Sequence, residues 1–374
     1  MAGSNETTCN DKSAENPLHA TNSREFRYLF KLPPELRLSI YRHHFLSTRL
    51  SYGLSIDLDA KTIPARHSLA LLRTCRRVRT EIGDTWLGHV LFNFADVDYM
   101  MVILKALPMA TLSKIRHVRI LGTELCFFTD LGEHDAVSYT LVQALKLLPG
   151  LQLDTFTVLS PGEDDYDYEV LNDLIEYGDG WKELRFICQV PSQLGYKSDN
   201  GYRHKNSRSY PRKPQPAHWA SVMNTRDGIQ NQPSVTIYQS VRLGEPCSVM
   251  HEATRVIIEQ WPWKEKEHVT LAEMFSATYF EKKEEALEVM VVVKRGKGIN
   301  YQEGEHPRYL TAISDIRKDF PHTSWAEIKS RFLRWSDDGT YHGSYCEHRK
   351  PPLMDIYKHV QEYTWRELRM KLCL

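Results

Sequence analysis

The sequence has few of the features that mark secreted, membrane-bound or strongly charged proteins. Only seven of its 374 residues are cysteine, and none forms a Cys-x-x-Cys pair, which favours a reducing compartment over a disulfide framework. The longest aliphatic run, 287–293, is broken only by Glu288 and is too short to span a bilayer. Residues 1–22 lack the apolar segment of a secretory signal. Lysine plus arginine (48) equals aspartate plus glutamate (48), so the basic excess of a dedicated nucleic-acid-binding protein is missing. We therefore expect a cytoplasmic or nuclear protein without a membrane segment.

Catalytic and cofactor-binding motifs are also missing. There is no Gly-x-Ser-x-Gly nucleophile elbow, and the basic, glycine-containing stretch 294–298 lacks the phosphate-binding loop pattern. The pair His251-Glu252 has no second histidine for a zinc-protease helix, and Cys346 has only His342 and His348 nearby as further metal ligands. We expect no catalytic activity, no cofactor and no metal. An enzyme of unrecognised type stays an alternative, because scattered histidines and acids can meet in three dimensions.

What is present begins with a polar tail and a clearly marked helix. Residues 1–25 are rich in asparagine, serine, threonine and charge, which predicts disorder. The sequence Leu-Pro-Pro-Glu-Leu at 32–36 is typical of a helix start, because proline fits the first turn and Glu35 lies at the positive end of the helix dipole. We expect this helix to end near Leu46.

This first helix is apolar on two sides. At about 100° per residue, Leu36 and Ile40 share one side, whereas Leu38, Tyr41 and Phe45 cluster nearly opposite. Such a helix is either buried on both sides within its own chain or buried on one side and bound to a partner on the other. The sequence leaves both interpretations open.

A polar connector at 47–68 leads to a second predicted helix at 68–86. Its apolar positions recur every three or four residues, at Leu72, Cys75, Val78, Ile82 and Trp86. Four arginines, at positions 73, 76, 77 and 79, predict a solvated or ion-paired face. A strand is then expected at 90–94, and Asp96 is the predicted N-cap of a further helix.

From residue 97 onward, helices alternate with short strands. The predicted elements are helices at about 97–107, 135–148 and 168–177, and strands at 115–121, 153–159 and 184–188. The strand spacing of ~30–40 residues lies in the range of solenoid repeats. Strands that each follow a helix favour a parallel sheet covered by helices. This rhythm is like that of an irregular leucine-rich repeat.

The remaining chain is less regular. Prolines, glycines and polar residues predict a long loop at 191–232. Beyond it we expect a strand at 235–238, a helix at 249–260, a strand at 286–294 and amphipathic helices from about 308. The fold class is therefore α/β. Its predicted regions are a tail at 1–25, a helical element at 26–95, a repeat-like region at 96–245 and a mixed α+β region with helices at 246–374.

One stretch of the long loop combines basic and aromatic side chains. Basic residues neutralise phosphates and aromatic rings stack on bases, so this stretch is the best candidate for nucleic-acid binding. Its members are Tyr196, Lys197, Tyr202, Arg203, Lys205, Arg208, Tyr210, Arg212 and Lys213. The favoured interpretation is a loop that packs against the acidic run 163–169, because no known RNA- or DNA-binding module accompanies the patch. The acidic run itself is interpreted as a solvated lead into a helix.

Two stretches resemble a known family. The sequence Leu-Pro-Pro-Glu-Leu-Arg-Leu-Ser-Ile-Tyr-Arg at 32–42 is similar to the opening helix of the F-box-like proteins of filamentous fungi. The sequence Leu-Leu-Arg-Thr-Cys-Arg-Arg-Val-Arg-Thr-Glu at 71–81, followed by Phe-Asn-Phe at 92–94, resembles the second block of that family. Residues 181–188 and 233–240 resemble later portions of such proteins.

This resemblance implies docking to the Skp-type adaptor of a cullin–RING ubiquitin ligase. The implied contact residues are Leu32, Pro33, Pro34, Leu36, Ile40 and Tyr41. An F-box is compact and its docking surface needs both helices at a fixed angle, whereas the connector at 47–68 separates them here. On this basis we expect a protein-interaction module that recruits an unidentified target and performs no chemistry. The loop at 196–213 supplies the nucleic-acid-binding alternative.

Overall fold

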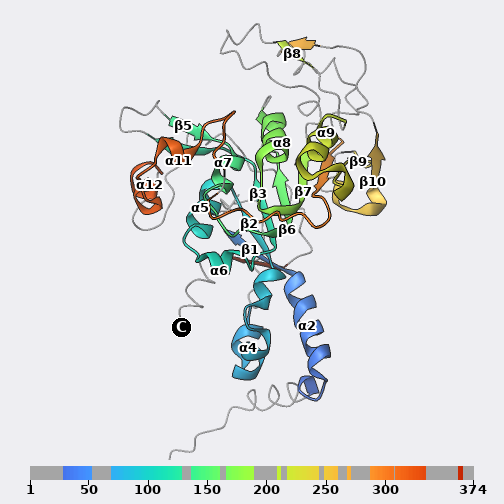
Figure 1. Ribbon diagram of the computed structural model, residues 1–374. Helices are drawn as coiled ribbons and strands as arrows, with labels where there is room; N and C mark the ends of the chain where they lie inside the picture. Colours follow the sequence, from blue (N-terminus) through green and yellow to red (C-terminus); the bar gives the residue numbers. More distant parts are fainter. Residues whose placement is uncertain are drawn as a thin grey trace, which may run out of the picture.

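The computed structural model shows a mixed α/β protein built around one large, mostly parallel sheet (Figure 1). It describes residues 28–52, 69–128, 136–160, 166–188, 209–211, 217–243, 248–259, 268–270, 287–306, 308–333 and 361–364. Among these, no helix combines the length and the hydrophobicity that crossing a bilayer requires.

The described part of the sheet has nine strands in the order β10-β9-β12-β7-β6-β3-β2-β1-β13. Their bounds are β1 Thr48–Tyr52, β2 Leu91–Phe94, β3 His117–Leu121, β6 Leu153–Leu159, β7 Trp181–Cys188, β9 Ser234–Ser240, β10 Arg255–Ile258, β12 Val289–Lys294 and β13 Gln361–Thr364. From β13 to β7 every neighbouring pair is parallel, whereas β12, β9 and β10 pair antiparallel. Strands β1, β2, β3, β6 and β7 lie side by side in chain order, so the sheet grows in one direction as the chain proceeds.

Helices pack on one face of this sheet. They are α5 Val97–Leu104, α7 Leu141–Leu145, α8 Tyr166–Tyr177 and α9 Ala217–Asp227. The strand residues Val118, Phe156 and Phe186 belong to the same buried apolar core as Leu174 of α8 and Trp219 of α9. The core therefore lies between the sheet and these helices, as expected for parallel strands joined by helical crossovers.

The other face of the sheet carries buried polar side chains. Asn93 of β2 donates a hydrogen bond from Nδ2 to the Ser51 Oγ of β1 at 3.1 Å. Arg119 of β3 donates from Nη1 to the Asn93 Oδ1 at 2.9 Å. These three residues are opposite one another in register, so the polar row extends over the three adjacent strands β1, β2 and β3.

The alternation of helices and strands from residue 97 is confirmed. Strands β3, β6 and β7 fall within or next to the predicted spans and pair in parallel. Asp96 is the N-cap of α5, and its Oδ1 accepts a hydrogen bond from the Tyr99 N–H at 2.9 Å.

Replacing Asp96 with alanine is expected to lower the free energy of unfolding by about 1 kcal/mol, because the first turn of α5 loses its cap. Urea denaturation of both proteins measures this difference. Asp96→Asn keeps a capping oxygen and is the control that should stay close to wild type. Equal losses in the two variants would contradict the capping role.

Two predicted helices are wrong because the backbone leaves the helical conformation inside them. The helix at 68–86 divides into α3 Leu71–Thr74, α4 Arg76–Ile82 and the 3-10 helix η1 Thr85–Gly88. The break is at Cys75, which is extended and caps α4 by accepting from the Val78 N–H. The helix at 135–148 begins as strand β5 Ala136–Tyr139, which pairs with β4 Leu125–Phe128, and only α7 is helical.

Three further predictions need correction. The helix at 249–260 consists of the short 3-10 helices η4 Ser248–Met250 and η5 Glu252–Thr254 and then β10, whose Val-Ile-Ile run favours a strand. The long loop at 191–232 contains α9 and the 3-10 helix η3 Ile229–Asn231. The connector at 47–68 begins with β1, which lies inside the sheet.

The short elements after β12 close one end of the body. Helices α11 Ile316–Asp319 and α12 Trp325–Arg331 confirm part of the predicted helical region. Phe320 and Phe332 pack beside Phe127 of β4, with ring centroids 5.4 and 6.1 Å from it. A separate two-stranded pair joins β8 Ser209–Pro211 to β11 His268–Thr270, and α6 Met109–Leu112 precedes β3.

Candidate protein-interaction surface

Helix α2 Pro34–Leu46 stands beside α4, and both project from the sheet-based body (Figure 1). The helix begins as the sequence predicts, with a proline in its first turn and Glu35 as an acidic residue there. We call α2 and α4 together the helical arm. Its geometry depends on contacts that residues of the two family-like stretches make with one another.

The centre of the helical arm is an ion pair between those two stretches. Arg37 of α2 places Nη2 2.7 Å from the Glu81 Oε1 and Nε 3.0 Å from the Glu81 Oε2. Tyr41 adds a hydrogen bond from its hydroxyl to the Glu81 Oε2 at 3.2 Å, and Arg77 donates to Oε1 at 2.9 Å. Arg37 also donates to the Leu32 carbonyl at the start of the arm. Because the Arg37 guanidinium binds the Glu81 carboxylate through two hydrogen bonds, this contact fixes the relative orientation of the two side chains as well as their distance.

The base of the helical arm is held by aromatic packing. Phe45, in the last turn of α2, is buried, and its ring lies 6.3 Å from that of the buried Trp86. Since β1 begins two residues after α2 ends, the sheet also restrains this end of the helix. Polar contacts at the middle and apolar contacts at the base therefore set the angle between α2 and α4.

The outer side of α2 is apolar and exposed. Leu36 is 53% exposed and Ile40, one turn further along, is 46% exposed. We call these two residues the docking stripe. Because solvent reaches both side chains, the described residues do not cover the stripe, which argues against α2 being internal on both sides.

The other predicted contact residues divide between surface and interior. Pro33 and Pro34 are exposed and Leu32 is half-buried at the start of the arm. Tyr41 is buried and bonded to Glu81, so it holds α2 in place instead of presenting a surface. Leu38 is exposed, although its position in the helical wheel is closer to the buried side.

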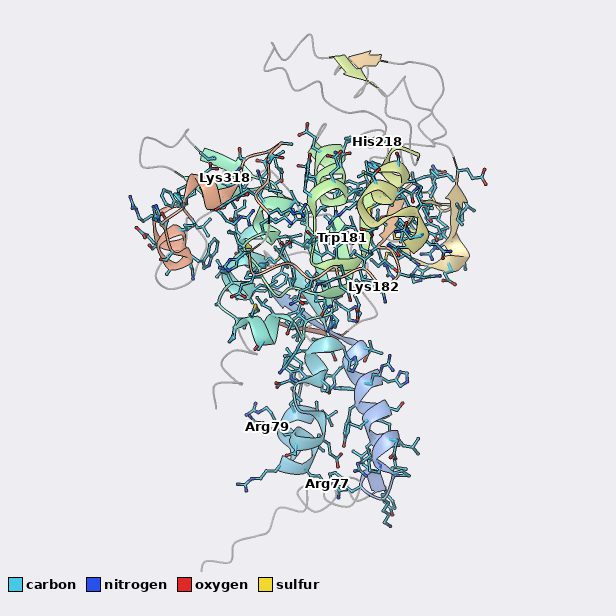
Figure 2. The ribbon with its side chains drawn as sticks, in the orientation of Figure 1. Arg77, Arg79, Trp181, Lys182, His218 and Lys318 are labelled. Carbon is cyan, nitrogen blue, oxygen red and sulfur yellow. The ribbon has the colours of Figure 1, made fainter. Side chains whose placement is uncertain are left out.

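All four arginines predicted on the second helix are exposed, Arg73 on α3 and the other three on α4. Figure 2 shows Arg79 pointing away from α2. Arg77 lies over the Phe30 ring at 4.7 Å while it also pairs with Glu81. The predicted solvated or ion-paired face therefore contains both kinds of arginine.

The Glu81 carboxyl titrates far below its usual range. The hydrogen bond from Arg37 is the largest cause, and together with the hydrogen bonds from Arg77 and Tyr41 it outweighs burial and lowers the pKa of Glu81 to about 2. A carboxyl with a depressed folded-state pKa stabilises the fold above its unfolded pKa of about 4.5, and that stabilisation is lost as the pH falls from about 4.5 towards 2.

We expect the Glu81 side-chain carbon signal to titrate in NMR with a midpoint near 2. In Arg37→Gln the midpoint should move up towards 4.5, because the principal donor is lost. Lys114→Gln removes a different surface ion pair, with Asp84, and should leave the Glu81 midpoint unchanged. A wild-type midpoint at 4 or above would contradict the ion-pair geometry.

A second cluster of ionisable groups, which the sequence did not reveal, lies where β6 and β7 begin. We call it the charge cluster. It consists of Lys146, Asp179, Arg226, Asp227, Arg295 and Glu303. Asp179 is its hub, with the Arg226 Nη2 at 2.6 Å and the Arg295 Nη1 at 3.1 Å. The cluster joins α7, the α8–β7 loop, α9 and the segment after β12.

The most deeply buried members of the charge cluster are Asp227 and Glu303. Asp227 accepts from the Arg295 Nε at 2.9 and 3.0 Å and from the Gly296 N–H at 2.7 Å. Both carboxylate oxygens of Glu303 lie 3.3 Å from the Lys146 Nζ, and burial raises the pKa of Glu303 to about 7. Figure 2 places Trp181 inside the body at this level, and Arg295 lies over its ring at 5.6 Å. These groups are interlocked and buried, so they position the elements around them.

Other candidates from the sequence have different outcomes. Of the basic aromatic stretch, only the backbone of Tyr210, in β8, falls within the described residues; the other eight residues lie outside them, so nucleic-acid binding stays a prediction. The acidic run does lead into α8, yet Asp167 is buried and accepts a hydrogen bond from Ser160. His342, Cys346 and His348 lie outside the described residues. Within the described ones, no group of three or more His, Cys, Asp or Glu is arranged to hold a metal ion.

Comparison with known proteins adds no second line of argument. No protein-family model, curated protein or solved structure matches this chain. The candidate surface therefore rests on the geometry of the helical arm.

Proposed function

We propose that the protein is an interaction module whose helical arm docks onto a partner protein through Leu36 and Ile40. The partner that fits the resemblance is the Skp-type adaptor of a cullin–RING ubiquitin ligase. In this proposal Arg37 and Glu81 hold α2 and α4 at a fixed angle. The two helices can then form one docking surface although β1 and the residues after it separate them in the sequence. The mechanism is positional: the arm binds the ligase, and the body presents a target.

The exposed docking stripe is the observation that carries this proposal. An exposed Leu or Ile is common by itself. Here the two are adjacent on a helix that projects from the body and is fixed from behind by an ion pair and by aromatic packing. At about 25 cal/mol per Å², covering two half-exposed aliphatic side chains contributes about 2 kcal/mol, or roughly a 30-fold gain in affinity.

The body is proposed to be leucine-rich-repeat-like. The support is that β1, β2, β3, β6 and β7 are neighbours in chain order and that α5, α7 and α8, which lie between β2 and β7 in the chain, pack on one face. In such an arrangement, the surface of the body on the side away from the helical arm is available for contact with a target. We place this activity in the cytoplasm or nucleus.

The proposal is tested by calorimetric titration of the full-length protein with a purified Skp-type adaptor. We expect binding by the wild type and at least a 30-fold loss in the double variant Leu36→Asp with Ile40→Asp, because two charges would replace the apolar contact. The matched control is Val137→Asp with Ile229→Asp, two exposed aliphatic residues on the body, and it should bind like wild type.

Circular dichroism distinguishes the two ways in which the stripe variant can fail. If it melts like wild type, the loss of binding belongs to the surface. A wild-type protein that does not bind the adaptor at about 10 µM would refute the ligase role. Equal binding by wild type and stripe variant would show that another surface is used.

A further inference from the structure

Strand β10 is an edge of the sheet and exposes aliphatic side chains. In the described residues it pairs only with β9, and Figure 1 shows it at the periphery of the body, far from the helical arm. Val256 is 47% exposed and Ile257 is 62% exposed, although neighbouring residues in a strand point to opposite faces. Both faces of this edge are therefore open. Proteins usually protect such an edge with charge, proline or a covering element, because it can pair with another strand.

The register between β9 and β10 shows which backbone groups are available. The Val241 N–H donates to the Thr254 carbonyl at 2.9 Å, so these opposed residues form a hydrogen-bonded pair. Hydrogen-bonded and non-hydrogen-bonded pairs alternate in an antiparallel ladder. Val256 and Ile258 therefore bond to β9, whereas the N–H and C=O of Arg255 and Ile257 point out of the sheet. Within the described residues, no hydrogen bond is made by the backbone of Ile257 outside its ladder.

We propose that β10 pairs with β10 of a second copy of this chain, antiparallel and centred on Ile257. In this register Ile257 lies opposite its own counterpart, and Arg255 lies opposite Glu259 of the second copy. By the alternation described above, the backbone N–H and C=O groups of Arg255, Ile257 and Glu259 point out of the sheet. The backbone hydrogen bonds and the side-chain charges therefore favour the same register. The sheets of the two copies then become one continuous sheet across a twofold axis.

Charge complementarity is what selects a second copy over another partner. The segment from Arg255 to Glu259 has a cation at one end, an anion at the other and three aliphatic residues between them. When two copies of this segment lie antiparallel, each cation is therefore opposite an anion of the other copy, as a twofold interface requires. A shift by two residues in either direction places Arg255 opposite an uncharged residue.

The two charges lie at opposite ends of β10. Glu259 is exposed immediately after β10. Arg255 lies over the Tyr238 ring of β9 at 4.3 Å, 3.6 Å from Glu252 and 3.5 Å from the Met250 carbonyl, so its guanidinium rests over β9 and, in the dimer, turns outward to meet Glu259 of the second copy. The proposal does not depend on the function of the helical arm, which lies elsewhere on the molecule.

Light scattering coupled to size exclusion tests the proposal on the full-length protein. At about 50 µM we expect the wild type to have twice the monomer mass. Glu259→Arg and Arg255→Glu should each weaken the dimer roughly 10–100-fold, since each brings like charges together at both ends of the interface. An equimolar mixture of the two variants should recover the dimer mass, because both contacts are then between opposite charges.

A backbone variant provides a separate test. Ile257→Pro removes an N–H that points out of the sheet, so the ladder with β9 keeps its hydrogen bonds while the new ladder loses its central pair. We expect a folded monomer, with a circular dichroism spectrum like that of wild type. Ile229→Pro at another exposed position is expected to remain dimeric. A monomeric wild type, an unchanged dimer in Ile257→Pro, or a mixture that fails to recover the dimer would each overturn the proposal.

Discussion

Asp227→Ala is expected to lower the free energy of unfolding by about 3–5 kcal/mol, the cost of removing one partner of a buried ion pair. Asp227 is fully buried and accepts two contacts from Arg295 and one from the Gly296 N–H. Without it, the guanidinium of Arg295 stays buried with Asp179 as its remaining anion. Urea denaturation monitored by tryptophan fluorescence measures the loss, because Trp181 lies beside this guanidinium.

The double variant Asp227→Ala with Arg295→Met is the control for this prediction. Methionine fills much of the space and carries no charge, so the double variant should recover most of the lost stability. If Asp227→Ala costs less than about 1 kcal/mol, the cluster has relaxed around Asp179 and the prediction fails. If the helical arm binds the adaptor as proposed, that binding should be unchanged in Asp227→Ala, since the helical arm is not part of the charge cluster.

The free energy of unfolding is expected to fall as the pH rises from about 4.5 to about 7, owing to Glu303. Burial, opposed by the charge of Lys146, raises the pKa of this carboxyl from 4.5 to about 7 in the folded protein. The folded state therefore binds a proton that the unfolded chain has already released, and the contribution of Glu303 to stability is fully present below pH 4.5 and lost as the pH rises through about 7. A rise of this size corresponds to about 3 kcal/mol, because one pH unit is equivalent to 1.36 kcal/mol.

Glu303→Gln isolates this effect. The amide has the same shape and does not titrate, so the difference in unfolding free energy between variant and wild type should change by about 3 kcal/mol between pH 4.5 and 7 and stay constant above pH 8. Asp154→Asn, which changes a carboxyl bonded to Tyr301 in the same neighbourhood, should not reproduce that pH dependence. A constant difference for Glu303→Gln over the whole range would show that Lys146 keeps this carboxylate ionised.

Local sequence patterns predict an element correctly where the residues that determine it all lie within that element. Strands β3, β6 and β7 and the Asp96 cap are each determined by a run of a few residues, which is why the sequence predicts them correctly. The pattern was misleading where the backbone changes conformation within an apolar run. Cys75 interrupts a regular helical spacing because its extended backbone caps α4. The Val-Ile-Ile run of β10 lies in a predicted helix, because the sequence indicates a strand at 235–238 but does not show that this run pairs with it.

The candidate surface also has one part that the local sequence predicts and one part that it does not. The helical wheel separates Leu36 and Ile40 from Tyr41 and Phe45, and burial confirms that separation except at Leu38. The ion pair that fixes α2 was not predictable, because Arg37 and Glu81 are 44 residues apart. The charge cluster is still less local: Lys146 and Glu303 are 157 residues apart and meet only once the sheet is assembled.

The pairing of β1 with β13 bears on how the protein is made. Residues 48–51 are in register with 361–364, so one side of β1 finds its neighbour more than 300 residues further along the chain. Until then a nascent chain can complete β1 to β7 while that side of β1 remains unsatisfied and able to capture stray strands. Chaperone protection during synthesis would matter most at this seam.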